Sequence, residues 1–153
     1  LGVVAGTAVT SDAVDIVAAD PAMQRRVMEK ALAMAGLSAG DIGLVHAHAT
    51  STPVGDRLEA EAIRAVLGNQ VPVTSTKSLT GHLLGGAGAL GAVVMVQSLK
   101  TGAVPGTGNL DEPDEGIDLN VLRGTVEGQP AGAGIANAFG FGGHSTALVI
   151  TES

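Results

Sequence analysis

The order of apolar and polar positions along the chain predicts strands that alternate with helices. LGVVAGTAV at residues 1–9 is apolar and rich in β-branched side chains, which favours a strand. Asp20 and Pro21 then supply an N-cap and a proline at the first helical position. Apolar residues recur at helical spacing after this start, at Met23, Val27, Ala31 and Met34. Gly36 indicates where this helix ends.

The next segment repeats the pattern and contains the first histidines. Residues 42–47 form a short apolar run, which predicts a strand that ends at the histidines. Thr52 and Pro53 mark the start of a second helix, which ends at Gly68. Its apolar stripe comprises Leu58, Ala62, Ile63, Val66 and Leu67, opposite the polar residues Asp56, Arg57, Glu59, Glu61 and Arg64. This pattern is typical of an amphipathic surface helix, and residues 71–75 predict the strand that follows it.

Residues 83–99 predict a helix that is apolar almost all round. Gly85, Gly86, Gly88 and Gly91 lie within it, and each glycine costs up to about 1 kcal/mol relative to alanine. A helix tolerates that cost where another backbone must approach closely, so we expect this glycine-rich helix to be fully buried. The run from Gly86 to Gly91 also fits the dinucleotide-binding fingerprint, but that motif needs its first glycine directly after a strand. We therefore interpret these glycines as positions of close packing.

The last part of the chain predicts a loop and two paired strands. Residues 109–116 are rich in turn formers, and residues 133–138 and 146–151 are strand-like runs joined by FGFGGHS. The whole pattern predicts an α/β domain with a mixed five-stranded sheet and helices layered against it. The length of 153 residues fits a single domain over residues 1–153. Because the chain opens within a strand pattern rather than at a methionine, we expect it to be a fragment of a longer protein.

Composition and charge narrow the classes of function. The formal net charge is −7, and the eight lysines and arginines form no run, so a nucleic-acid partner is not expected. The chain contains no cysteine, which excludes disulfides, thiolate metal ligands and a cysteine nucleophile within it. The apolar run at 83–96 has about 14 residues, too few to span a hydrocarbon core of roughly 30 Å. We therefore expect a soluble cytoplasmic protein without a membrane partner.

The histidines of the stretch VHAHATSTPVGD are the first candidates for chemistry. His46 and His48 are two residues apart and would share one face of a strand. Together with His82 and His144 they could form a zinc site. No aspartate or glutamate stands at a recognisable metal-ligand spacing beside them, so a zinc-binding module remains only an alternative.

The stretch TSTKSLTGHLLG carries a second candidate histidine. His82 would open the glycine-rich helix, and the partial positive charge of a helix N-terminus favours a neutral imidazole. A neutral imidazole can donate one hydrogen bond to a carbonyl oxygen that is becoming an enolate. Lys77 adds a cation five residues earlier, although it could also be an ordinary solvated loop residue.

The stretch FGFGGH contains both phenylalanines of a chain that has no other aromatic ring except histidine. The glycines on either side of Phe141 allow backbone N–H groups to point at a ligand, as in an oxyanion hole. The alternative is a hairpin whose turn carries a hydrophobic plug.

Taken together, four stretches resemble the C-terminal half of a β-ketoacyl-(acyl carrier protein) synthase, a thiolase-like condensing enzyme. They follow that family's order and spacing and cover essentially the whole chain: HAHATSTPVGD, STKSLTGHLLGGAGA, VPGTGNLDEPDEGIDL and NAFGFGGH. The resemblance implies a thiolase-like αβαβα layered fold of two similar halves, of which this is the second. It also implies the decarboxylative Claisen condensation of fatty acid elongation, with the bacterial type II elongating synthases as the most similar group.

The resemblance also implies roles for particular residues. His48 and His82 would hydrogen-bond the malonyl thioester oxygen and stabilise its enolate, and Lys77 would organise the site electrostatically. Phe141 would act as the gating phenylalanine, with its backbone N–H in the oxyanion hole. The substrate-binding residues would be Thr50, Thr52 and Phe139, of which the two threonines contact the phosphopantetheine arm.

The implied partners are an acyl carrier protein and a second copy of the same subunit. No cofactor is expected, because phosphopantetheine arrives on the carrier protein, and no metal is expected. The nucleophilic cysteine of the family belongs to its first half, so we expect the chain alone not to condense acyl groups.

Three positions depart from the family pattern. Gly91 stands where type II synthases usually carry a glutamate that pairs with the lysine, whereas related polyketide synthases also have glycine there. His46 and Ser145 each replace an asparagine. These departures leave a polyketide ketosynthase, or a non-catalytic chain-length partner subunit, as the alternatives to fatty acid elongation.

Overall fold

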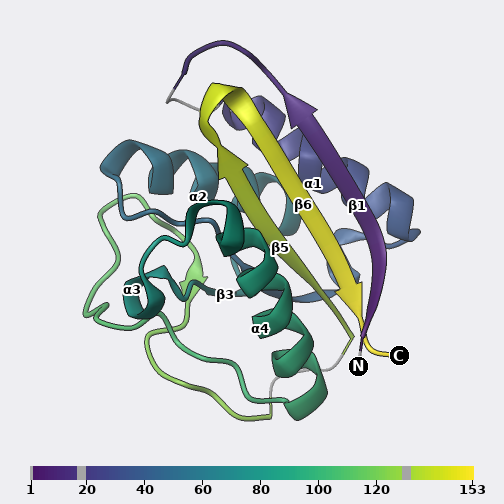
Figure 1. Cartoon of the computed structure of the whole chain (residues 1–153). Helices are drawn as coiled ribbons and strands as arrows, with labels where there is room; N and C mark the ends of the chain where they lie inside the picture. The colour runs from purple at the N-terminus through teal and green to yellow at the C-terminus, as the bar shows by residue number, and fades with distance from the viewer. Residues whose placement is uncertain (1, 17–19, 129–131) are drawn as a thin grey trace.

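The computed structural model describes residues 2–16, 20–128 and 132–153. The strands are β1 (Val3–Ser11), β2 (Ile42–His46), β3 (Pro72–Thr74), β4 (Asn120–Val121), β5 (Ala133–Gly140) and β6 (His144–Thr151). The helices are α1 (Pro21–Ala35), α2 (Pro53–Leu67), α3 (Lys77–Thr80) and α4 (Ala87–Thr101), with 3-10 turns η1 (Ala39–Asp41), η2 (Leu84–Gly86) and η3 (Phe141–Gly143). Figure 1 shows the strands as one twisted sheet with helices on both faces. Position 1 of the predicted first strand lies outside the described residues.

The strands form one mixed sheet in the order β1-β6-β5-β2-β3-β4. The pairs β1–β6 and β6–β5 are antiparallel, whereas the pairs β5–β2, β2–β3 and β3–β4 are parallel. This confirms the predicted α/β fold with a mixed sheet, but the sheet has six strands rather than five. The additional strand β4 has only two residues, which pair with Pro72 and Val73. A strand that short produces no readable alternation of apolar and polar residues.

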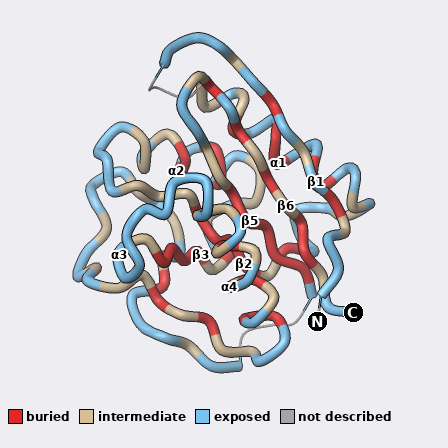
Figure 2. Tube along the Cα trace, viewed as in Figure 1, coloured by how far each residue is buried: buried red, intermediate tan, exposed pale blue. Residues whose placement is uncertain are grey.

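Two separate cores hold the helices to the sheet. On one face, α1 and α2 pack with the strands around Val27, Met28, Ile63 and Ile135. On the other face, α4 packs through Met95 and Leu99 against Leu44 and Ile150. Figure 2 shows the buried residues concentrated along the central strands and on the helix faces turned toward them. The sheet therefore has a helix layer on each side, with β2 and β5 at its centre.

The helix α1 has the bounds that the sequence predicts. The Asp20 carboxylate accepts a hydrogen bond from the Ala22 N–H at 2.8 Å, and Pro21 follows the cap. Gly36 ends the helix in the left-handed conformation, with φ of 67°. The dihedral angle explains the glycine, because side chains rarely tolerate this region.

The prediction for the glycine-rich helix is wrong in two respects. The helix α4 begins at Ala87, because Leu84 has a positive φ of 52° and the chain before it turns irregularly. It is also not fully buried: the sheet covers one face, through Gly91, Met95, Ser98 and Leu99. On the other side Val93 is 57% exposed, and Leu84 in the preceding turn is 75% exposed.

Within the described residues, no helix combines the length and the apolarity that crossing a bilayer requires.

The close approach of β1 to α1 generates a stability prediction. Gly6 lies at a register irregularity of β1, and a Cβ there would collide with the Ala31 carbonyl oxygen and lie 2.8 Å from the Ala35 nitrogen. Both obstacles are helix backbone and cannot rotate away. We expect Gly6→Ala to lower the free energy of unfolding by about 1–3 kcal/mol in denaturant titration.

The matched control is Gly40→Ala, because the nearest atom to a Cβ at position 40 is the Ser38 hydroxyl at 3.9 Å. This control should change the free energy of unfolding by no more than about 0.5 kcal/mol. Equal stability of the two variants would show that β1 can move off α1 at no cost.

Candidate functional site

The candidate site is built at the carboxyl ends of the parallel strands β2 and β3. β2 ends at His46, which is 3% exposed, and the chain leaves the sheet through Ala47 and His48. β3 ends at Thr74 and leads into the short helix α3, which starts at Lys77. Loops at this edge of a parallel sheet commonly carry ligand-binding residues.

Three of the predicted site residues meet at this edge. The rings of His48 and His82 have centroids 5.6 Å apart and planes inclined by 81°, an edge-to-face arrangement. The Phe139 ring, at the end of β5, lies 5.6 Å from the His48 ring at 57°. The structure thus brings together two histidines and a phenylalanine that are up to 91 positions apart in the chain.

The surroundings of His48 favour a neutral imidazole. Burial, and then the nearby Lys77 and His82, lower the pKa of His48 to about 3. Its buried Nδ1 atom has no hydrogen-bond partner among the described residues. A neutral ring can serve as a hydrogen-bond donor or acceptor without adding a positive charge to the site.

His82 is oriented differently from the sequence prediction. It precedes α4 by several residues, so the end of that helix does not hold it. Instead its Nδ1 accepts the N–H of Leu84 at 3.1 Å, which places the ring proton on Nε2. The ring is exposed and therefore presents an N–H donor outward.

Lys77 is part of the site and is not a solvated loop residue. Its ammonium group donates a hydrogen bond to the carbonyl oxygen of His48. Burial lowers the pKa of Lys77, and the negative charges of Glu59 and Asp56 oppose that shift. The cation therefore ties the first turn of α3 to the segment after β2.

Glu59 is the main site residue that the sequence analysis missed. It was assigned to the polar face of α2, but it is only 3% exposed. Its two carboxylate oxygens accept the N–H groups of His48 at 2.8 Å and Ala49 at 2.7 Å. Asn137 donates a third hydrogen bond to it at 3.3 Å. The spacing to the buried Ile63, four positions later, was the signal that Glu59 faces inward.

The buried position of Glu59 affects its acidity. Burial raises the pKa of its carboxyl group, and the hydrogen bonds from Ala49, His48 and Asn137 oppose this shift. The carboxylate thus fixes the backbone just before Thr50, and the residues on either side of Thr50, Ala49 and Ser51, have positive φ angles of 32° and 62°. Thr50 in this irregular segment is half-buried, and Thr52 after it is exposed.

A cavity of about 500 Å³ lies beside this segment. Among the residues that line it are Thr50, Thr52, Lys77 and His82. The hydroxyl oxygens of Thr50 and Thr52 lie 3.3 Å apart. Volumes of this size are typical of small-molecule sites. The two predicted threonines therefore share one cavity with two of the predicted catalytic residues.

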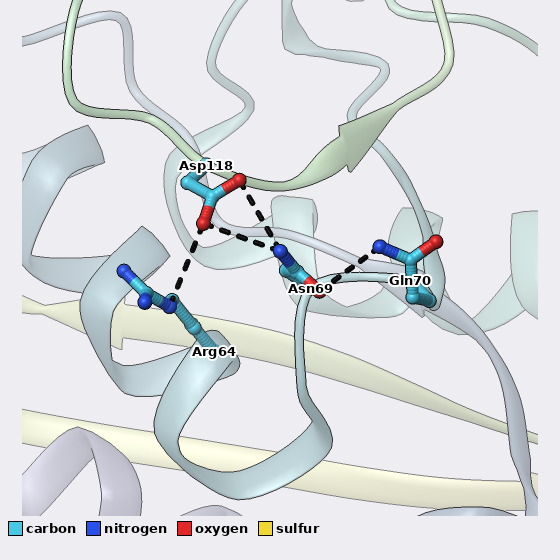
Figure 3. Close-up of polar contacts among 4 residues, drawn as sticks. All are labelled: Arg64, Asn69, Gln70 and Asp118. Atoms are coloured by element: carbon cyan, nitrogen blue, oxygen red, sulfur yellow. Dashed lines mark hydrogen bonds and ion pairs between the residues drawn. The ribbon is translucent and has the colours of Figure 1, made fainter.

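The loop between α4 and β4 forms the opposite wall of the cavity through Thr107, Asn109 and Leu110, among others. Figure 3 shows how its end is fastened to the end of α2. Both oxygens of Asp118 accept hydrogen bonds from the Asn69 amide at 3.2 Å, and Arg64 lies 3.7 Å from Asp118. The Arg64 and Asp118 side chains are 63% and 59% exposed, so this ion pair contributes little stability and mainly sets position.

Phe141 and His144 are not among the rings that contact the histidine pair in the described part of the chain. Phe141 is 74% exposed in η3, and no aromatic contact of its ring is found in the described part of the chain. His144 is also exposed. Across residues 2–16, 20–128 and 132–153, no three histidine, aspartate or glutamate side chains are grouped to hold a metal ion, so the zinc alternative has no structural support. The gating role of Phe141 stays a prediction.

The sequence of the chain matches a known protein family. Residues 1–111 match the family described as Beta-ketoacyl synthase, C-terminal domain, so the chain belongs to the β-ketoacyl synthases. The 3-oxoacyl-(acyl-carrier-protein) synthase 2 of Vibrio harveyi is 44% identical over 129 residues, which are 82% of this chain and 31% of that protein. The protein of the same name from Synechocystis is 40% identical over 156 residues, covering 99% of this chain and 38% of that protein.

Solved structures agree with this assignment. A β-ketoacyl synthase from Burkholderia phymatum has a TM-score of 0.96 at 33% identity, over 99% of this chain and 38% of that chain. The ishigamide ketosynthase/chain length factor has a TM-score of 0.93 at 30% identity, over 98% of this chain and 38% of that chain. These likenesses confirm the predicted thiolase-like fold. The chain spans between 31% and 38% of the lengths of these relatives.

The role of Glu59 generates a prediction about the segment after β2. In Glu59→Gln, one of the two side-chain oxygens becomes an NH₂ group, which cannot accept a hydrogen bond. One of the two backbone N–H groups, that of His48 or that of Ala49, then loses its acceptor. We expect the free energy of unfolding to fall by about 1–3 kcal/mol, as for a buried donor left unsatisfied. Amide exchange at His48 or Ala49 should accelerate, as measured by NMR. Glu61→Gln, exposed on the same helix, is the control and should leave both quantities unchanged.

The buried His46 generates a pH prediction. Burial, and then the charge of Lys77, lower the pKa of folded His46 from an ordinary value near 6.5 to about 4. Between pH 4 and pH 6.5 the ring is therefore neutral in the folded chain and protonated in the unfolded chain, so unfolding takes up a proton. Its contribution to stability is complete above pH 6.5 and is lost as the pH falls toward 4, up to about 3 kcal/mol. We expect His46→Gln to make the fall in unfolding free energy over this range shallower. Parallel pH profiles of parent and variant would contradict this.

Proposed function

We propose that the protein containing this chain is a 3-oxoacyl-(acyl carrier protein) synthase, an acyltransferase of fatty acid elongation. The observation that carries the proposal is the pairing of His48 with His82 beside a cavity lined by Thr50 and Thr52. Family membership and the names of the curated relatives support it.

In the proposed reaction the two imidazoles stabilise an enolate. The bond between the α-carbon and the carboxylate of a malonyl thioester breaks, carbon dioxide leaves, and the electron pair passes to the α-carbon and the thioester oxygen. The Nε2–H of His82, and the His48 ring, would hydrogen-bond that oxygen. The α-carbon then bonds to the carbonyl carbon of an acyl group held on a cysteine, and the thiolate leaves. The chain has no cysteine, so another part of the protein must supply this one.

The other residues would support this step. The hydroxyls of Thr50 and Thr52 would bind the phosphopantetheine arm in the cavity, and Phe139, whose ring contacts His48, would bind substrate. The Phe141 backbone N–H would contribute to the oxyanion hole for the acyl carbonyl. Lys77 would hold the backbone of His48 through its carbonyl oxygen.

The partner would be an acyl carrier protein that brings its own phosphopantetheine, so the synthase needs no cofactor. Support comes from a further structural relative, the AntDE ketosynthase in complex with its acyl-carrier protein AntF, with a TM-score of 0.91 at 26% identity over 99% of this chain and 38% of that chain. We also propose a homodimer located in the cytoplasm.

A second candidate is a polyketide ketosynthase or its chain-length partner subunit. Gly91 favours it, together with the likeness to the ishigamide ketosynthase/chain length factor. The nucleophile position in the remainder of the protein separates the two roles. A cysteine there supports an enzyme, and a glutamine supports the non-catalytic subunit.

The proposed function predicts the effect of removing one imidazole. In the protein that joins this chain to its other half, His82→Ala should slow decarboxylation of malonyl-carrier protein by about 10²–10³-fold, as for loss of one oxyanion donor. Release of carbon dioxide from labelled malonyl thioester measures this. His144→Ala, which removes an exposed imidazole, is the control. Unchanged decarboxylation in His82→Ala would exclude the role given to this residue.

A further inference from the structure

His46 is a buried polar residue that the proposed reaction leaves unused. It is 3% exposed and ends β2, on the sheet face that packs against α4. Its Nε2 and the hydroxyl of Thr76 lie 3.2 Å apart in a hydrogen bond. A buried imidazole that hydrogen-bonds one specific partner restricts the position of that partner as well as filling space in the core.

The ring of His46 also explains why position 91 holds glycine. A Cβ on Gly91 would lie 2.9 Å from His46 Nδ1 and 3.2 Å from Cε1. The backbone does not require glycine here, because Gly91 is an ordinary helical residue of α4 without a positive φ. Two of the three positions that depart from the family pattern are thus in contact, and the absence of a side chain at Gly91 makes room for the ring of His46.

Thr76 connects His46 to the catalytic region. It is the N-cap residue of α3, and its carbonyl oxygen accepts the N–H groups of Leu79 at 2.9 Å and Thr80 at 3.0 Å. Lys77 follows it directly and reaches back to the His48 carbonyl oxygen. These contacts form a closed circuit. His46 at the end of β2 contacts Thr76, and Lys77, which follows Thr76, contacts His48, two positions after His46.

The charged groups near these contacts also favour a neutral imidazole at position 46. Glu59 and Asp56 face the Lys77 cation and stabilise it, and burial together with that cation keeps the pKa of His46 low. A neutral ring adds a hydrogen bond near the ammonium group without adding a second positive charge.

We propose, as an inference that rests on the proposed function, that His46, packed against Gly91, is a positioning residue: its hydrogen bond to Thr76 holds the start of α3 where Lys77 can bind the carbonyl oxygen of His48. Its loss would therefore lower kcat while leaving KM for the malonyl thioester nearly unchanged, because the Glu59 carboxylate, which substitutions of His46 leave in place, still holds the Ala49 backbone that leads to the cavity threonines.

The test compares three substitutions in the protein that joins this chain to its other half. His46→Leu keeps the volume but removes the hydrogen bond, and we expect kcat for decarboxylation to fall about tenfold or more. His46→Gln can place its amide nitrogen near the position of Nε2 and should restore most of kcat. Gly91→Ala should lower kcat in the parent but have no effect in a His46→Ala background, where the methyl group has room.

Gly85→Ala is the matched glycine control, since no atom lies within 4 Å of a Cβ at position 85. A second readout is independent of activity: NMR titration of the Lys77 side chain, whose pKa burial lowers. In His46→Leu this pKa should rise toward the ordinary lysine value, and in His46→Gln it should stay low.

The outcomes separate the positioning role from the proposed function. Normal kcat and an unchanged Lys77 titration in His46→Leu would overturn the positioning role while leaving the function intact. Absence of decarboxylation in the parent would overturn the function, and the Lys77 titration alone would then decide whether His46 positions this turn. Equal losses of kcat in His46→Leu and His46→Gln would show that His46 acts only through packing, because the glutamine amide would then give no advantage over an apolar side chain.

Discussion

The site depends on one buried carboxylate. Glu59 receives the N–H groups of His48 and Ala49 on its two oxygens, and so holds the backbone in the irregular path that follows β2. Without an acceptor those amides would be buried and unpaired, and the free energy penalty would favour a different loop. The position of the His48 ring and the direction of the threonines after it both follow from this path.

A cation completes the same arrangement from the other strand. Lys77 binds the carbonyl oxygen of His48, so the peptide groups around that histidine are held on both sides, by a carboxylate and by an ammonium group. The two charges stabilise each other in a partly buried setting, where each alone would be unfavourable. The site is therefore preorganised by contacts to the main chain of His48.

The sequence predicted the elements whose ends carry local signals. The helix α1 begins after Asp20 and ends at Gly36, because capping and left-handed glycine are short-range effects. Pairings between distant segments were less accessible: the two-residue strand β4 and the inward turn of Glu59 depend on what packs against them. Family motifs located His48, His82 and Phe139, which the structure brings together, although periodicity alone gave no reason for their contact.

The placement of β1 has a consequence for how the chain acquires its structure. β1 pairs along its length with β6, so that Val3 lies opposite Thr151, and Figure 1 shows the two strands side by side. During synthesis the first of the described strands emerges long before the last. Its partner arrives only when nearly all of the chain has left the ribosome, and contacts so distant in sequence form slowly. Until then the backbone edge of β1 lacks the hydrogen-bond partners that β6 supplies.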